Sequence, residues 1–239
     1  MESISPKKRI WELDFIKGVA ILLVVIIHAV VFINDYSSMH IAFTPFTWFV
    51  KKRGGAIFVL VSGICTALST KSTVKRGLAV FGFGLLISLA RLLLYRQTGN
   101  PYDLTFWGVL HLIGFCMILY PLMKRIPKPL LIVLSVGIIV YGYYLNEFTF
   151  TNNPYLYPLG LTTLSFDQWD WFPVLPHMGW FMLGVFLRET VYKDGKSRIR
   201  TSLEENLIIR FFCWCGRNSL WIFLFHQPIC YFAARYIIK

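Results

Sequence analysis

The sequence predicts an all-α polytopic membrane protein, built as a single bundle of about seven transmembrane helices. The chain of 239 residues is 56% hydrophobic, and its mean hydropathy of +0.58 is well above that of soluble domains. Several apolar runs are long enough to cross a hydrocarbon core of about 30 Å. No stretch fits a separate soluble domain, so we expect residues 1–239 to form one transmembrane domain.

The apolar segments follow one another with short polar turns between them. We expect helices at residues 11–34, 55–70, 77–95, 106–123, 129–147, 173–190 and 207–237. Basic turns at residues 71–76 and 124–129 separate neighbouring segments. Residues 43–50 predict a short interfacial or re-entrant helix. The last segment is long enough for an interfacial lead-in before a span that starts near Arg217.

The basic residues of the connections predict the orientation in the membrane. Cytoplasmic loops carry an excess of Lys and Arg. With the N-terminus inside, most basic residues, including 7–9, fall on the inner side, and the outer loops hold only Lys51, Lys52, Arg53 and Arg96. We therefore expect a multi-pass cell-membrane protein with a cytoplasmic N-terminus and an extracytoplasmic C-terminus. The net charge of +12 then reflects loops that face anionic lipid and an anionic ligand, with no nucleic acid as a partner.

The first segment carries two ionisable side chains on one face. Lys17 and His28 are eleven residues apart, so a helix returns them to nearly the same face, about 16 Å apart along its axis. Ionisable groups within a membrane usually face a bundle interior or a wet cavity. Two other interpretations stay open, because Lys17 can extend into the headgroup region and His28 can be a hydrogen-bonded contact between helices.

All five histidines fall on the outer side of the expected bilayer midplane. A shared polar chamber that opens outward would explain the grouping of His28, His40, His111, His177 and His226. Their spacing lacks two close ligands such as histidines at positions i and i+4, so we expect no metal site. The five cysteines all lie in or beside apolar segments and predict packing residues instead of a disulfide framework.

Two further polar positions suit such a chamber. Arg91 lies deep in the third apolar segment and cannot lose its charge, so it needs a carboxylate, a phosphate or water nearby. Asp167 and Asp170 come just before the segment at 173–190, whose first prolines suit a helix start. An interfacial aromatic belt with a structural aspartate is equally compatible with this stretch.

Several blocks of sequence, in this order along the chain, resemble one family. Residues 13–28, LDFIKGVAILLVVIIH, are similar to a first helix with the motif D-x-x-R-G-x-A that ends in histidine. The blocks FVLVSGI at 58–64, WGVLHLIG at 107–114, DWFPVLP at 170–176 and GRNSL…HQPI at 216–229 follow. Together they resemble the heparan-α-glucosaminide N-acetyltransferase catalytic-domain family of transmembrane acyltransferases. Lys17 stands where the family usually has arginine, which keeps the charge but not the bidentate geometry.

The resemblance implies a reaction and a set of partners. Acetyl would pass from cytoplasmic acetyl-CoA to an extracytoplasmic acceptor, an amino sugar of a glycan, by N- or O-acetylation. Direct transfer and transfer through an acetyl-histidine are both compatible with the motifs. The protein would act in the lipid bilayer, and a homodimer is left open.

The same resemblance suggests roles for individual residues. His28 is the preferred catalytic base, and His40 is the second candidate because it is nearest to the luminal position of the catalytic histidine in lysosomal relatives. CoA phosphates need cations on the cytoplasmic side, and the expected donor-binding residues are Lys17, Lys75, Arg76, Arg217 and Asn218. The expected acceptor-binding residues are Arg91, His111, Asp170, His177 and His226.

A different class of function also fits a helical bundle with buried polar residues. In a non-enzymatic transporter, or a lipid- or polyprenol-binding protein, these residues would form a translocation path. The unequal helices and the lack of an inverted repeat argue against a transporter. Stabilisation by acetyl-CoA would distinguish the two classes, because a ligand that binds the folded state raises its thermal stability by mass action.

Overall fold

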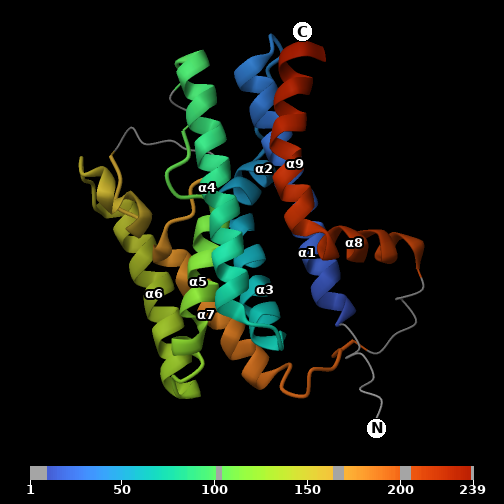
Figure 1. The fold of residues 1–239 in the computed structure, drawn as a ribbon, viewed down its shortest axis with the longest axis vertical. Coiled ribbons are helices and arrows are strands. Elements are labelled where there is room, and N and C mark those ends of the chain that lie inside the picture. The colour runs from blue at the N-terminus through green and yellow to red at the C-terminus, as the bar shows by residue number, and fades with distance from the viewer. Residues whose placement is uncertain (1–9, 101–103, 164–169, 200–205, 238–239) are drawn as a thin grey trace. The chain divides into compact units, whose positions relative to one another are not determined.

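The computed structural model describes residues 10–100, 104–163, 170–199 and 206–237. Figure 1 shows that helices make up most of this part of the chain. The elements are α1 (Trp11–Tyr36), α2 (Pro45–Phe49), η1 (Val50–Gly54), α3 (Gly55–Leu68), α4 (Thr73–Thr98), α5 (Val109–Met123), α6 (Lys128–Phe148), η3 (Pro154–Leu159), α7 (Val174–Thr190), α8 (Leu207–Arg217), α9 (Ser219–Phe232) and η5 (Ala233–Ile237). The basic residues 7–9 and the candidate Asp167 lie outside the described residues.

All of the expected apolar segments correspond to helices, but fewer of them qualify as membrane spans than the sequence predicts. Among the described residues, α1, α4 and α6 are the three helices long and apolar enough to cross a membrane. The pair α8 and α9 would make a fourth span, broken by a bend of 82°. The helices α3, α5 and α7 have 14, 15 and 17 residues, fewer than the roughly 20 that a crossing needs. The described residues therefore support three to four spans.

Local sequence explains where the long helices begin and end. Ile10 offers no side-chain cap to α1, but Glu12 and Asp14 occupy its first turn, where negative charge is favourable. Ser72 caps α4, since its hydroxyl accepts a hydrogen bond from the Lys75 N–H at 3.4 Å. The same helix ends at Gly99, which has a φ of 68°, a left-handed conformation that glycine adopts without steric cost.

The chain divides into two compact units, residues 1–58 with 188–239, and residues 59–187. In the first unit, α1 packs along α8 and α9. The packing with α8 is backbone against backbone, because a Cβ atom at Gly18 would overlap the Phe212 carbonyl oxygen and one at Gly216 would overlap the Asp14 carbonyl oxygen.

A sharp bend joins α8 to α9 at Asn218. The Asn218 side chain donates to the Trp214 carbonyl at 2.9 Å, which satisfies one of the carbonyls left unpaired at a helix C-terminus. Along α8, Cys213 and Gly216 are buried, whereas Phe211 and Trp214 are exposed. The break falls at the position near Arg217 that the sequence predicts, and Figure 1 shows α8 running across the direction of α9.

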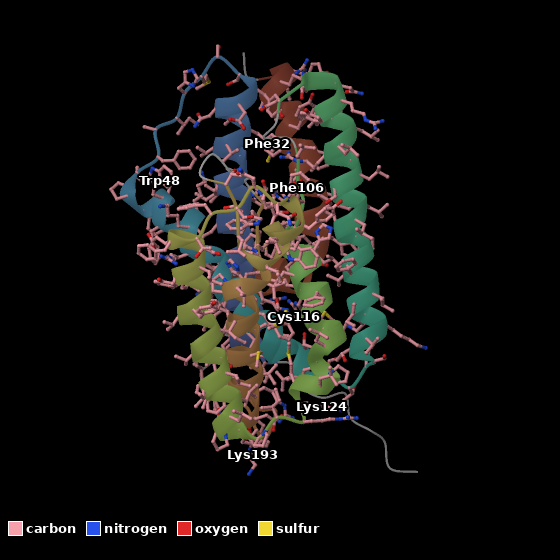
Figure 2. All side chains as sticks on the ribbon, turned by 90° about the vertical axis from the view of Figure 1, so that its left-hand side faces the viewer. Phe32, Trp48, Phe106, Cys116, Lys124 and Lys193 are labelled. Carbon is pink, nitrogen blue, oxygen red and sulfur yellow. The ribbon has the colours of Figure 1, made fainter. Side chains whose placement is uncertain are left out.

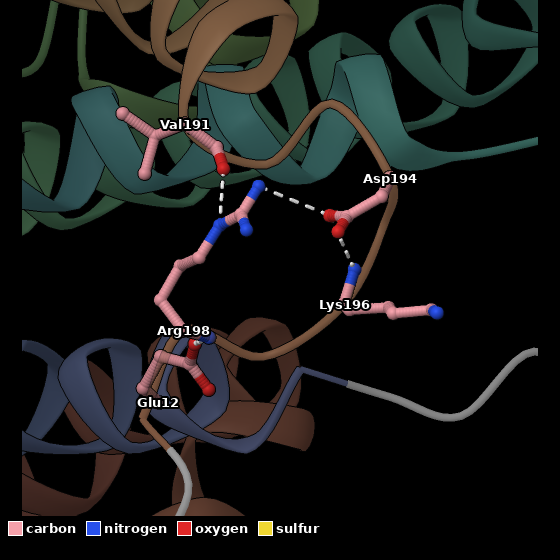
Figure 3. A network of polar contacts seen from close by, with 5 residues as sticks. All are labelled: Glu12, Val191, Asp194, Lys196 and Arg198. Atoms are coloured by element: carbon pink, nitrogen blue, oxygen red, sulfur yellow. Dashed lines mark hydrogen bonds and ion pairs between the residues drawn. The ribbon is translucent and has the colours of Figure 1, made fainter.

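The loop that follows α7 is tied to the start of α1. Glu12 is only 3% exposed, and its two carboxylate oxygens accept hydrogen bonds from the Ser197 hydroxyl and the Arg198 N–H, both at 2.7 Å. Figure 3 shows that Arg198 also donates to the Val191 carbonyl and pairs with Asp194, at 3.1 Å. The loop therefore folds around Arg198 and is held to α1 by a buried carboxylate.

The second unit is a set of helices that approach one another at glycines. Helices α4 and α5 meet at Gly77 and Gly114, where a Cβ on Gly77 would come within 2.8 Å of the Gly114 carbonyl oxygen. Helices α6 and α7 meet at Gly179, which faces the Ser135 carbonyl. Cys116 is fully buried, as expected for a packing residue. Figure 2 shows it within this unit, and Lys124 where α5 ends and the chain turns toward α6.

Candidate functional site

The first unit holds a buried pair of histidines. His28 on α1 is 9% exposed and His226 on α9 is 4% exposed. The Nδ1 atom of His28 lies 2.6 Å from the Nε2 atom of His226, and the two ring planes are nearly parallel, with an angle of 7° between them. The Nδ1 atom of His226 lies 2.7 Å from the Phe223 carbonyl oxygen. The imidazole that the sequence places on the same face of the first helix as Lys17 is therefore one half of a hydrogen-bonded pair.

Two of the expected donor-binding residues, Lys17 and Arg217, lie next to the glycines at which α1 crosses α8. Lys17 is half-buried and directly precedes Gly18, whereas Arg217 is exposed and directly follows Gly216. Because those two glycines bring the backbones of α1 and α8 together, both basic residues belong to the same helix crossing. Arg217 Nε donates to the Cys213 carbonyl at 3.2 Å, which leaves the remainder of its guanidinium to interact with other groups.

The second unit holds His111 in an aromatic enclosure at the start of α5. His111 is 3% exposed, and its Nδ1 atom accepts a hydrogen bond from the Gly108 N–H at 3.2 Å. The Trp107 ring stacks on it with centroids 5.6 Å apart, and the Phe81 ring meets it edge-on at 5.4 Å. A neutral His111 with an acceptor at Nδ1 carries its proton on Nε2.

Asp170 is buried next to this enclosure and caps α5. Its Oδ1 atom accepts a hydrogen bond from the Val109 N–H at 3.3 Å, and its carboxylate lies against Gly108. Burial raises the pKa of Asp170 to about 6, against the lowering effects of the Val109 hydrogen bond and of the Arg91 charge. Asp170 is thus the carboxylate near Arg91. It belongs to the N-terminus of α5, although the sequence places it just before α7.

The remaining candidates occupy separate positions. His177 lies in α7 and its Nδ1 atom is 3.1 Å from the Pro173 carbonyl oxygen. Leu175 has non-helical backbone angles, so the regular part of α7 begins at Pro176, a position that suits proline. His40 is exposed in the connection after α1.

The other two basic candidates lie at the start of α4, in the second unit. Lys75 and Arg76 are both exposed there. Arg76 donates to the Ser69 hydroxyl at 2.7 Å, across the turn between α3 and α4. These cations are therefore available to an anionic ligand at the start of that helix.

Tertiary structure thus brings some candidates together and keeps others apart. It joins His28 to His226, and it groups His111, Asp170 and Arg91. These two groups belong to different compact units, so a single chamber that contains all the histidines stays a prediction. Within the described ranges, no group of three or more His, Cys, Asp and Glu side chains could hold a metal ion.

Sequence reasoning missed the pairing itself and the acid that secures the first helix. His28 and His226 are 198 positions apart, and no local pattern links them. The only indication for Glu12 in the sequence is that an acidic residue stands at the start of an apolar segment, where it needs a hydrogen-bond donor if it is buried. Trp107 precedes His111 by one helical turn within the block WGVLHLIG, and that spacing could have predicted the stacked rings.

The fold and these buried groups define a helical membrane protein with polar side chains held inside its helix packing. Its family follows from comparison with known proteins: the chain belongs to the family described as "Heparan-alpha-glucosaminide N-acetyltransferase, catalytic", which it matches over residues 9–228. This is a family of membrane acetyltransferases that use acetyl-CoA. Comparison with curated proteins and with solved structures gives no match.

Proposed function

We propose that this protein is an integral-membrane acetyltransferase that moves acetyl from cytoplasmic acetyl-CoA to an extracytoplasmic acceptor, an amino sugar of a glycan. The family membership supports the reaction class. The observation that carries the assignment of the site is the buried His28–His226 pair, with 2.6 Å between the two ring nitrogens. In this proposal the N-terminus lies in the cytoplasm and the C-terminus outside.

His28 acts as the general base in the proposed reaction. The acceptor nitrogen attacks the thioester carbonyl carbon, a C–N bond forms and the C–S bond breaks. The sulfur leaves as the CoA thiolate, and the proton of the attacking amine passes to His28. The imidazolium then returns that proton to the thiolate or to water. General-base catalysis of this kind contributes roughly 10²- to 10⁴-fold in rate.

The donor would lie along α1. Lys17 and His28 are separated by about 16 Å of helix, which is comparable to an extended pantetheine arm. Lys17, Arg217 and Asn218 at the α1–α8 crossing would bind the phosphates of CoA through charge-assisted hydrogen bonds. Lys75 and Arg76, exposed at the start of α4 in the second unit, are separate candidates for binding a phosphate group.

Within the second unit by itself, the polar side chains around Asp170 have the chemistry to bind a sugar. His111 and Asp170 are buried, and Arg91 lies close enough to lower the pKa of Asp170. A site that binds the hydroxyl and amino groups of a sugar needs such fixed donors and acceptors inside an otherwise apolar bundle. We assign Arg91, His111, Asp170 and His177 to this acceptor site.

The test compares His28→Ala with His40→Ala in purified protein. We expect His28→Ala to bind acetyl-CoA with unchanged affinity and to lose at least about 100-fold in acetyl transfer, because the base acts only as the amine attacks. His40→Ala should retain activity, since His40 is exposed in a loop. An active His28→Ala together with an inactive His40→Ala would move the chemistry to that loop. If acetyl-CoA fails to stabilise the wild-type protein against heat, the enzyme assignment itself is wrong.

A further inference from the structure

The geometry of the histidine pair points to a separate role for each ring. We infer that His226 is a positioning residue that holds His28 in the tautomer with a proton on Nδ1, so that Nε2 of His28 is the nitrogen that accepts the proton of the acceptor. The catalytic consequence rests on the function proposed above. The tautomer itself follows from the hydrogen bonds and from the burial of the two rings.

The direction of the hydrogen bonds starts at the Phe223 carbonyl oxygen. A carbonyl oxygen can only accept, so the Nδ1 atom of His226, 2.7 Å away, must carry a proton. A neutral His226 then has its lone pair on Nε2. That atom lies 2.6 Å from Nδ1 of His28, which must therefore donate. A neutral His28 that donates from Nδ1 has its lone pair on Nε2.

Burial favours this neutral arrangement over a protonated pair. Both rings are less than 10% exposed, and Phe223 is buried beside them at 3%. A second proton on either ring would place an extra charge in this buried packing, and burial disfavours the charged form of an imidazole. One N–H on each ring is enough to form the hydrogen bond between the rings and the hydrogen bond to the Phe223 carbonyl, with no net charge.

The backbone makes the arrangement rigid. Phe223 and His226 are three residues apart on α9, so their hydrogen bond is fixed by the helix and turns Nε2 of His226 toward α1. The two ring planes are nearly parallel, with 7° between them, which suits an N–H···N hydrogen bond that lies in the plane of both rings. The arrangement resembles the general case in which a second group sets the tautomer of a functional histidine through its other ring nitrogen.

Two variants separate positioning from packing. His226→Phe keeps a ring of similar shape but removes the acceptor, so His28 is no longer restricted to one tautomer. His226→Gln restores an acceptor, because its side-chain carbonyl oxygen can receive the His28 Nδ1–H. Loss of an orienting group of this kind typically costs 10- to 100-fold. We expect that loss in kcat for His226→Phe, an unchanged KM for acetyl-CoA, and a partial recovery in His226→Gln.

The decisive measurement is ¹⁵N NMR of the full-length protein, labelled at histidine, in detergent. Comparison with His28→Ala assigns the His28 signals. We expect a protonated Nδ1 and an unprotonated Nε2 for His28 in the wild type, a mixture of both tautomers in His226→Phe, and the wild-type pattern again in His226→Gln. A wild-type His28 protonated on Nε2, or a tautomer unchanged in His226→Phe, overturns the inference.

The two readouts also separate this inference from the function on which it rests. If the wild type transfers no acetyl but shows the expected tautomers, the hydrogen-bond assignment holds and the proposed function fails. If the wild type is active and His226→Phe retains full kcat, His226 does not position the base.

Discussion

Gly18 of α1 and Gly216 of α8 face each other at a crossing where neither position has room for a side chain. A Cβ atom at either glycine would overlap a backbone carbonyl of the other helix. Because backbone atoms cannot rotate away as a side chain can, Gly18→Ala or Gly216→Ala must push the helices apart. We expect each change to cost more than about 2 kcal/mol, seen as a lower melting temperature in detergent.

Gly137→Ala is the matched control for this contact. Gly137 lies within α6, and a Cβ atom there would meet nothing within 4 Å. Alanine in a helix interior is favoured over glycine by about 0.5–1 kcal/mol, so this variant should be as stable as the wild type or slightly more so. Equal destabilisation by all three substitutions would contradict the special role of the α1–α8 crossing.

The buried Glu12 carboxylate should protect the loop that follows α7 from cleavage by a protease. Glu12→Ala removes the acceptor for both Ser197 and Arg198, and the loop loses its connection to α1. Limited trypsin digestion should then cut after Lys193 and Lys196 several-fold faster than in the wild type, because cleavage needs local opening of the chain.

Ser197→Ala provides a graded comparison. It removes one of the two hydrogen bonds to Glu12 and leaves the backbone N–H of Arg198 in place. Its rate of cleavage should fall between those of the wild type and Glu12→Ala. Identical digestion rates in all three proteins would show that the loop does not depend on Glu12.

Asp170 should make stability depend on pH. Its pKa rises from 3.8 to about 6 on burial, so between these values the folded protein binds a proton that the unfolded chain has released. The free energy of unfolding that Asp170 contributes by binding this proton is therefore fully present below about pH 4. It is lost as the pH rises through 6, a change of about 3 kcal/mol. Asp170→Asn does not titrate and can still accept the Val109 N–H.

The measurement is the difference in melting temperature between wild type and Asp170→Asn, followed from pH 4 to pH 7. The wild type should lose stability relative to the variant as the pH rises through this window. A difference that stays constant would mean that Asp170 titrates in the folded protein as it does in the unfolded chain.

Binding of CoA should depend on the cations at the α1–α8 crossing. Removal of a charged hydrogen-bonding group costs about 1.5–3 kcal/mol, so Lys17→Ala and Arg217→Ala should each weaken CoA binding by roughly 10- to 100-fold in calorimetry. Lys124→Ala removes an exposed cation from another loop expected on the cytoplasmic side and should leave the affinity unchanged. Unchanged affinity in both test variants would remove these residues from the proposed donor site.

Much of the fold could be predicted because helices depend on local pattern. Each apolar run of helical length in the sequence corresponds to a helix in the structure. The span expected to start near Arg217 corresponds to α9, which follows the bend after α8. The sequence predicted about seven spans, whereas the described residues support three to four, because the ends of α3, α5 and α7 depend on caps and kinks. The non-helical Leu175, which shortens the regular part of α7, is one example.

The sequence by itself determined the helical membrane class, the family motifs and the shared face of Lys17 and His28, since each depends on residues close together in the chain. Only the tertiary structure decided which side chains meet. Asp170 caps α5 instead of the helix that follows it, and His28 pairs with His226 across 198 positions. Helical periodicity fixes the face on which a residue lies. Its partner on another helix depends on how closely the two helices pack, which here is set by glycine contacts such as that of Gly18 with α8.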